Sequence, residues 1–340
     1  MLYPTFPSNT SSLLSKYLTQ EIFDELKEKK TAYGFTLAKA INSGIQNSDS
    51  DIGVYAGDEE SYELFAPLFN KIIEDYHGFS SASSHRSNLD MNNLKIKALD
   101  DEYILSTRIR VGRNLEGFPL GTIISKAERN EVEQLVSRAL NTLDAELEGA
   151  YYPLEGMSKE VQERLIKEHF LFKEGDRFLE SAGLNRDWAE GRGIYHNYEK
   201  TFLVWLNEED QLRIISMQQG GDVLAVFRRL VKALEALEKH LTFSYSKRLG
   251  YIASCPTNLG TSMRASVHIK LPKLAKDSVK LNAIAEKYQL QIRGVNGEHS
   301  ESKEGIFDIS NRRRLGVTEV EAIEALVEGI SALISVERSQ

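Results

Sequence analysis

Arginines at alternating positions are the feature of this sequence that most directly suggests chemistry. Arg108 and Arg110 follow Ser106 at every second position of one segment, and Arg264 lies four residues before His268. On a β-strand, side chains separated by an even number of residues lie on the same face of the sheet. Each guanidinium is a planar fork of donors that matches phosphate oxygens. The spacing predicts an anion site built from several strands, with the set Arg108, Arg110, Arg213, Arg264 and Arg293.

An alternative is that each of these arginines is an ordinary surface residue in an ion pair. Isolated surface ion pairs are common and contribute little stability. Two arginines in register on one strand weaken this alternative without excluding it. The pattern alone therefore leaves both interpretations open.

The common nucleotide and metal motifs are missing from the sequence. There is no G-x-x-x-x-G-K-[ST] loop and no G-x-G-x-x-G after a predicted strand. There is also no H-E-x-x-H helix and no cysteine cluster for zinc. If the protein binds a polyphosphate, arginine side chains must hold it.

One cysteine and several carboxylates could serve a cationic substrate. Cys255 would most often be a small buried side chain, but flanking hydroxyls and nearby arginines would favour a reactive thiolate. Glu208 and Glu209 occupy a predicted turn, where carboxylates are usually only solvated, and Glu298 lies in a glycine-rich stretch. Carboxylates and a thiolate facing arginine-bound phosphates would suit a cationic acceptor.

Two regions of different pattern predict two domains. Residues 1–80 carry apolar side chains at helical spacing and predict a small helical domain, residues 81–100 predict a linker, and residues 101–340 predict a larger catalytic domain. Strands are predicted at 103–111, 201–206, 212–217, 266–271, 290–294 and 306–309, with helices after Ser125, after Asp222 and after Thr318. Tight turns between strands, with separate long helices, are typical of an α+β fold with a largely antiparallel sheet.

The first of these strands should separate two kinds of side chain. We expect Leu105, Ile109 and Val111 to point to the core, opposite Arg108 and Arg110. Ser125 and Glu128 predict a capping box at the start of the first long helix.

Composition excludes several classes of protein. The chain has 340 residues and a formal net charge of −8, which argues against nucleic-acid binding. No apolar run approaches the roughly 20 residues that a membrane-spanning helix needs, so we expect no membrane partner. A single cysteine rules out an internal disulfide and predicts a reducing, cytoplasmic location.

Several segments, taken together and in order, resemble the phosphagen (guanidino) kinase family. They are residues 75–78, 106–110, 201–205, 207–213, 255–261, 264–268 and 308–311. Within the family, residues 293–294 followed by 297–299 are similar to the members that phosphorylate arginine. The resemblance implies a small helical N-terminal domain and a large domain with an eight-stranded antiparallel sheet flanked by helices.

The resemblance also implies a reaction and a set of site residues. The reaction is the direct in-line transfer of the γ-phosphoryl group between MgATP and L-arginine, with ADP and phosphoarginine as products and without a phosphoenzyme. The implied nucleotide and phosphate ligands are Ser106, Arg108, Arg110, His169, Arg213, Arg264, His268 and Arg293. The implied catalytic groups are Glu209, Cys255, Glu298 and Arg213, and the implied acceptor site adds Ser50, Gly53, Val54, Tyr55 and His299.

Magnesium would enter as MgATP without a direct protein ligand, with Glu208 and Asp210 reaching it through water. The sequence leaves a monomer or a homodimer open.

Two departures from the family pattern bear on the acceptor. Asp51 stands where arginine-using members commonly have glycine, and its carboxylate could repel the α-carboxylate of the substrate. Asn296 stands where some members have another arginine. Taurocyamine, lombricine and protein-bound arginine therefore remain alternative acceptors. Less favoured alternatives are a cysteine hydrolase that uses Cys255 with His268 or His299, and a catalytically silent scaffold.

Overall fold

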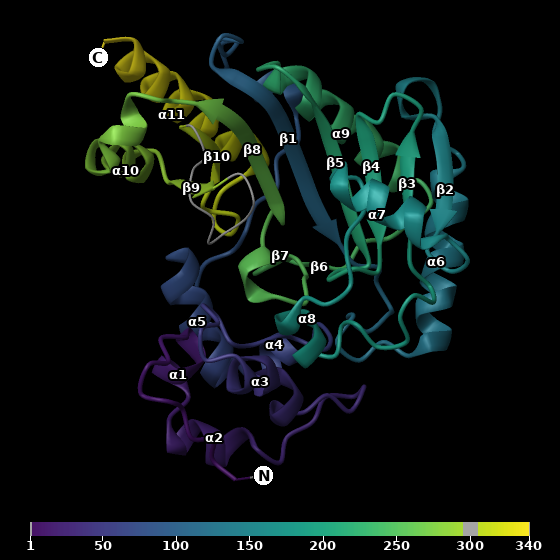
Figure 1. The fold of residues 1–340 in the computed structure, drawn as a ribbon. Helices are drawn as coiled ribbons and strands as arrows, with labels where there is room; N and C mark the ends of the chain where they lie inside the picture. Colours follow the sequence, from purple (N-terminus) through teal and green to yellow (C-terminus); the bar gives the residue numbers. More distant parts are fainter. Residues whose placement is uncertain (1, 295–304, 340) are drawn as a thin grey trace.

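The N-terminal part of the chain is a small bundle of short helices. The structure, a computed structural model, describes residues 2–294 and 305–339. Its first helices are α1 (Leu13–Tyr17), α2 (Gln20–Leu26), α3 (Leu37–Gln46), α4 (Ser61–Leu64) and α5 (Ala66–His77). Figure 1 shows them below the sheet of the large domain. Their apolar core continues into that domain through Leu249, Ile252, Leu259 and Leu315.

Side-chain caps explain why such short helices form. The hydroxyls of Ser12, Thr19 and Thr36 accept hydrogen bonds from the first turns of α1, α2 and α3. A capping hydroxyl satisfies one of the backbone donors that a helix start leaves free. Gly78 ends α5 in the left-handed conformation, with a φ of 63°.

The large domain is built on one eight-stranded antiparallel sheet. Its strands, in spatial order, are β2 (Gly149–Pro153), β3 (Gly193–Asn197), β4 (Phe202–Leu206), β5 (Leu212–Gln219), β1 (Ile104–Arg113), β8 (Met263–Lys270), β10 (Ile306–Asn311) and β9 (Leu290–Gly294). The predicted fold class is confirmed. The chain also forms a small ribbon of β6 (Tyr245–Ser246) and β7 (Gly250–Tyr251).

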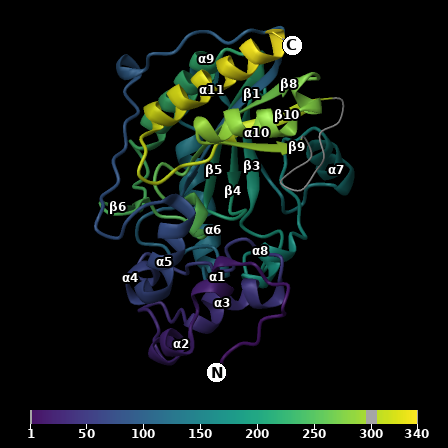
Figure 2. The same ribbon diagram turned by 90° about the vertical axis from the view of Figure 1, so that its left-hand side faces the viewer.

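Long helices cover one face of this sheet. They are α6 (Lys126–Leu140), α9 (Val223–Leu237), α10 (Ser278–Lys287) and α11 (Glu319–Ser339), and Figure 2 shows α10 and α11 crossing the near side of the sheet. Ile109, Val111 and Val267 point into the core between sheet and helices. On the opposite face, α7 (Lys159–Lys167) covers only the part nearest β3 and β4, where Leu165 packs against Ile194.

Most predicted elements are present, with two kinds of correction. The strands β2 and β3 were not predicted, because the burial pattern of β2 is half exposed and that of β3 almost uniformly buried, so neither alternates. Leu105 was predicted in the core but is 42% exposed, because a register irregularity between Ile104 and Ser106 reverses the alternation there. The capping box of Ser125 and Glu128 is present at α6.

The segment between the two domains follows the surface of the large domain. Asn88 donates its backbone N–H to the Glu319 carboxylate at 2.7 Å, and His85 donates its backbone N–H to the carbonyl of Arg248 at 3.2 Å. The domain limits at residues 80 and 100 stay a prediction. Within the described residues, no helix combines the length and apolar character needed to cross a bilayer.

The buried histidine at the end of α5 predicts acid lability. The His77 ring contacts the Pro256 carbonyl oxygen through Nε2 at 2.9 Å, and burial lowers its pKa to about 4. The unfolded chain binds this proton near pH 6.5, so stability is lost as pH falls from 6.5 toward 4. Between pH 7 and pH 5, His77 should account for about 2 kcal/mol of the fall in the free energy of unfolding.

Urea unfolding of wild type and His77→Gln at both pH values measures this contribution. The variant should lose less stability on acidification than wild type does. An equal loss in the two proteins would show that His77 is not responsible.

Candidate active site

Strand register brings the predicted arginines to one face of the sheet. Arg108 lies opposite Ser266, and Arg110 lies opposite Arg264. Residues directly opposite in an antiparallel pair have side chains on the same face. The same register pairs Gly112 with Arg213, Asp308 with His268, and Asp308 with Arg293. All five arginines therefore lie on the face that the long helices leave uncovered.

These arginines raise one another's electrostatic energy. Burial, with the charges of Arg213 and Arg264 nearby, lowers the pKa of Arg108 to about 10. Burial and the same neighbours hold the pKa of Arg110 well below its usual value. Nε and Nη2 of Arg108 are buried without a hydrogen-bond partner among the described residues. Buried donors without partners are costly, so the surface is complementary to a multivalent anion.

Carboxylates and one aromatic ring hold two of the arginines in place. Arg213 pairs with Glu208 at 2.9 Å and with Glu209 at 3.1 Å. The ring centroid of Trp205 lies 5.5 Å from the Arg108 guanidinium and 5.7 Å from that of Arg213. Both distances lie within the range of a cation–π interaction, which helps to hold the two cations in place.

Asp308 pairs with Arg264 at 2.8 Å and uses only one of its carboxylate oxygens. The other oxygen, Oδ1, is buried without a partner among the described residues.

A cavity of about 350 Å³ lies between the small domain and this face. The large domain contributes arginines and the acidic turn, which is the turn that carries Glu208 and Glu209 between β4 and β5. The small domain contributes the loop that precedes α4. The predicted residues that it brings together are Ser50, Tyr55, Arg110, Glu208, Glu209, Arg213, Cys255 and Arg293. Ser106, Arg108, Arg264 and His268 do not line it and lie on the same sheet face beside it.

Two other predicted acceptor residues lie in the same loop but are packed against the small domain. Gly53 has a φ of +79°, and a Cβ added there would lie 2.7 Å from the Cβ of Leu14. Only glycine fits this position without strain. Val54 is fully buried, so neither residue lines the cavity.

Glu209 and Cys255 both line the cavity, and each influences the pKa of its surroundings. Burial raises the pKa of Glu209 to about 7, although Arg213 opposes the shift. Burial and the negative charge of Glu209 raise the pKa of Cys255 to about 12, and its Sγ lies 3.1 Å from the Thr257 hydroxyl. Burial first, and the charge of Glu209 second, therefore favour the thiol in this arrangement, whereas the sequence predicted a thiolate.

Asp210, which the sequence assigned to a magnesium-bound water, is hydrogen bonded to other parts of the protein. Its Oδ1 accepts hydrogen bonds from Asn114 at 2.9 Å and from the backbone N–H of Ser254 at 2.8 Å. The buried carboxylate thus ties the end of β1, the acidic turn and the segment before Cys255 together. Since Asp210 is 5% exposed and does not line the cavity, it is a poorer candidate for a magnesium-bound water than Glu208, which lines it. The described residues contain no metal-binding group of three His, Cys, Asp or Glu side chains.

A buried arginine fixes the other side of the acidic turn. Arg192 is 1% exposed and donates from Nε to the carbonyl of Asn207 at 3.0 Å. Its remaining donors bind the carbonyls of Leu184, Arg186, Asp187 and Glu190. Asn207 in turn donates to the Gly191 carbonyl at 2.6 Å. The turn that carries Glu208 and Glu209 is therefore held from both ends.

Arg314 lines the cavity and was not predicted. It is 8% exposed and donates to the carbonyl of Thr257 at 3.1 Å and to the side chain of Asn258. Its signal was hidden because it ends a run of three arginines, which resembles a solvated charged segment.

The remaining predicted residues lie away from the cavity or outside the description. His169 is exposed just before Phe170, whose carbonyl accepts a hydrogen bond from Trp205. His268 is partly buried on the arginine face, and burial lowers its pKa. Asn296, Glu298 and His299 lie outside the described residues.

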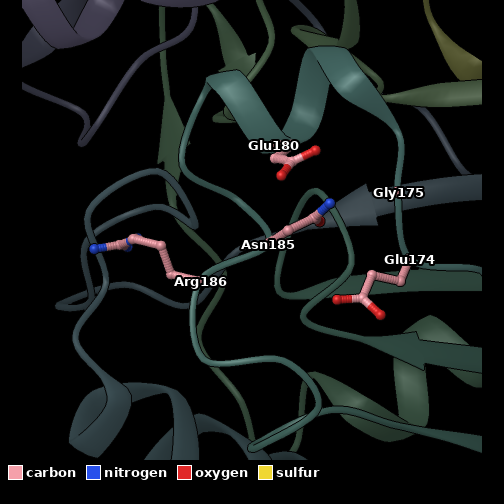
Figure 3. Close-up of a pocket in the computed structure, with 5 residues that line it drawn as sticks. All are labelled: Glu174, Gly175, Glu180, Asn185 and Arg186. Carbon is pink, nitrogen blue, oxygen red and sulfur yellow. The ribbon is translucent and has the colours of Figure 1, made fainter.

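A larger cavity, of about 510 Å³, lies next to α8 (Arg177–Ser181). It is lined by Glu174, Gly175, Glu180, Asn185 and Arg186. Figure 3 shows Arg186 pointing away from both carboxylates, and its Nη2 donates to the Ile124 carbonyl at 2.8 Å. Because these side chains do not converge, the arginine-lined cavity is the better candidate site.

Comparisons with known proteins match nearly the whole chain. The ATP:guanido phosphotransferase C-terminal catalytic domain matches residues 131–340, and the N-terminal domain matches residues 8–74. An arginine kinase of Artemia franciscana is 55% identical, and the match covers 98% of this chain and 94% of that protein. An arginine kinase of Schistocerca americana is 54% identical over the same shares of the two chains.

Solved structures agree with the fold. A lombricine kinase has a TM-score of 0.93 at 40% identity, covering 99% of this chain and 94% of that one. The duplicated taurocyamine kinase from Schistosoma mansoni with bound transition state analog components has a TM-score of 0.91 at 43% identity, covering 97% of this chain and 47% of that one.

The geometry around Trp205 predicts a direct optical signal of anion binding. The chain has two tryptophans, so Trp188→Phe leaves Trp205 as the sole reporter beneath Arg108 and Arg213. Titration with inorganic triphosphate should change its fluorescence. Adding Arg108→Ala should weaken binding about 10- to 100-fold, because a charge-assisted hydrogen bond contributes about 1.5–3 kcal/mol.

Arg138→Ala, which removes an exposed arginine from α6, is the matched control and should leave the affinity unchanged. Equal affinity in the Arg108 and Arg138 variants would contradict an anion site on this face.

Proposed function

The chain belongs to the ATP:guanido phosphotransferase family, and we propose from this membership that its acceptor is L-arginine. It is a phosphagen kinase, which transfers the γ-phosphoryl group of ATP reversibly to a guanidinium nitrogen. One observation carries the proposal: a single cavity is lined by the anion-binding arginines and by the acidic turn with Cys255.

The five arginines bind the phosphate groups and neutralise their negative charge. In phosphoryl transfer, positioning and charge stabilisation provide most of the catalysis. Arg108, Arg110, Arg213, Arg264 and Arg293 share one face, and their mutual repulsion is relieved when an anion binds. Ser106 on β1, His268 on β8 and His169 after α7 complete the proposed nucleotide site. Arg314 joins the set from its place in the cavity wall.

Glu209 and Cys255 have the task of orienting the guanidinium. A free guanidinium is protonated at neutral pH and is a poor nucleophile. Glu209 accepts hydrogen bonds from its N–H groups and takes the proton that leaves as the N–P bond forms and the bond from the γ-phosphorus to ADP breaks. Cys255, as a thiol, contributes shape and a soft polar contact. Glu298 is included on the family resemblance alone.

Magnesium fits the site as part of MgATP and not as a protein-bound ion. Glu208 lines the cavity and can hold a magnesium-bound water, while its Oε2 lies 2.9 Å from the Arg213 guanidinium. The metal neutralises phosphate charge, and the arginines provide the remaining compensation.

The two domains divide the substrates between them. Residues 101–340 bind MgATP, residues 81–100 connect the domains, and residues 1–80 recognise the amino-acid end of the acceptor through Ser50 and Tyr55. The cytosol, where ATP is abundant and thiols stay reduced, is the proposed compartment.

We choose L-arginine over other acceptors because arginine kinases are more similar in sequence to this chain than two other kinds of guanidino kinase are. The matched arginine kinases are 54–55% identical, whereas the lombricine and taurocyamine kinases are 40% and 43% identical. A substrate panel tests this choice. Consumption of ATP should be fastest with L-arginine, compared with taurocyamine, lombricine, creatine, glycocyamine and an arginine-rich protein. Faster turnover of another member of the panel would overturn the proposed acceptor.

The raised pKa of Glu209 predicts the pH dependence of the reaction. Glu209 accepts a proton only when ionised, and its pKa lies at about 7. The rate of phosphoarginine synthesis should therefore fall as pH decreases below 7. Glu209→Gln should lower kcat about 10²- to 10⁴-fold and remove this acidic limb.

Glu148→Gln, an exposed carboxylate next to β2, serves as the control with unchanged kinetics. An acidic limb that persists in Glu209→Gln would assign the proton transfer to another group.

A further inference from the structure

Positive and negative side chains are distributed unevenly between the segments that line the cavity. Its arginines all belong to the large domain, whereas the end formed by the small domain and α8 is lined by Asp49, Asp51 and Asp176. Arg177 pairs with Asp49, and Asp176 caps α8 through the backbone N–H groups of Phe178 and Leu179. Asp51 forms no ion pair within the part of the chain that the structure describes, so its charge is not compensated there.

A tyrosine also contributes to the cavity lining. Tyr55 is 8% exposed and lines the cavity. Burial raises the pKa of Tyr55 well above its usual value, and Cys255, Glu209, Asp176 and Glu208 add to the shift. A polar ligand group beside Tyr55 would therefore meet a negative field.

We propose that Asp51 is a specificity-determining residue that favours acceptors with a cation, and no carboxylate, at the end opposite the guanidinium. The inference rests on the proposed function, since it assumes that the guanidinium lies at Glu209 and Cys255. The substrate class is that of guanidinoalkylamines, of which agmatine, the decarboxylated form of arginine, is the simplest probe.

Charge balance gives the direction of this preference. The far end of L-arginine carries one ammonium and one carboxylate, so its attraction to Asp51 is largely offset by repulsion. Agmatine keeps an ammonium and lacks the carboxylate, so only the attraction remains. Asp51 is exposed, and solvent screens its charge, which limits the effect to about tenfold in the ratio of specificity constants.

The test compares kcat/KM for agmatine and L-arginine in wild type, Asp51→Asn and Asp51→Gly. In both variants the ratio of agmatine to arginine should fall about tenfold, mainly through a higher KM for agmatine. The asparagine variant keeps the side-chain volume, so agreement between the two variants assigns the effect to charge. The wild-type ratio should also fall as ionic strength increases.

Asp144→Asn is the matched control, because this exposed aspartate lies outside the cavity lining. A ratio that stays within twofold of wild type in both Asp51 variants, or that changes equally in Asp144→Asn, overturns the inference and leaves the kinase assignment intact. If wild type phosphorylates agmatine but not L-arginine, the proposed acceptor fails while the role of Asp51 is retained.

Discussion

Mutual repulsion among buried guanidinium groups is the constraint on which the rest of this structure depends. Arg108 and Arg110 share a face with Arg213 and Arg264, and burial together with these neighbours depresses the pKa of both. Such an arrangement is unfavourable without an anion. The surrounding fold must therefore keep the arginines together against their repulsion. The strand register between β1 and β8 does this by backbone hydrogen bonds that do not depend on the charges. The site is thus prepared for polyphosphate before polyphosphate binds.

The acidic turn is the counterpart of this positive surface. Glu208 and Glu209 both pair with Arg213, so the turn supplies local compensation without cancelling the other arginines. Its position is fixed by two buried connections, Arg192 to the Asn207 carbonyl and Asn114 to the Asp210 carboxylate. These connections join segments that are far apart in the chain, and through Ser254 they also set the distance between Glu209 and the cysteine segment. Because the turn is held at both ends, Glu209 stays in the cavity lining while it pairs with Arg213.

Local pattern was sufficient for the elements whose sequence repeats with one period. The alternation that begins at Ser106 and the capping box at Ser125 predicted β1 and α6. Local pattern failed where tertiary contacts determine burial. It missed β3, which is buried on both faces, and it misplaced Leu105, which the irregularity beside Ile104 moves to the surface. Arg314 was missed for a related reason, since burial of the last arginine in a run of three depends on the loop folding over Thr257.

The sequence by itself determined which residue types could bind phosphate, that no standard nucleotide loop was available, and, through its family resemblance, the reaction class and the fold. These properties depend on side-chain chemistry and on short-range spacing, both of which are written directly in the chain. Only the tertiary structure decided that burial and Glu209 raise the pKa of Cys255, that Asp210 joins three segments, and that Asp51 lines the same cavity as the arginines. Ionisation and specificity depend on burial and on charges brought from distant segments, and neither can be read from spacing along the chain.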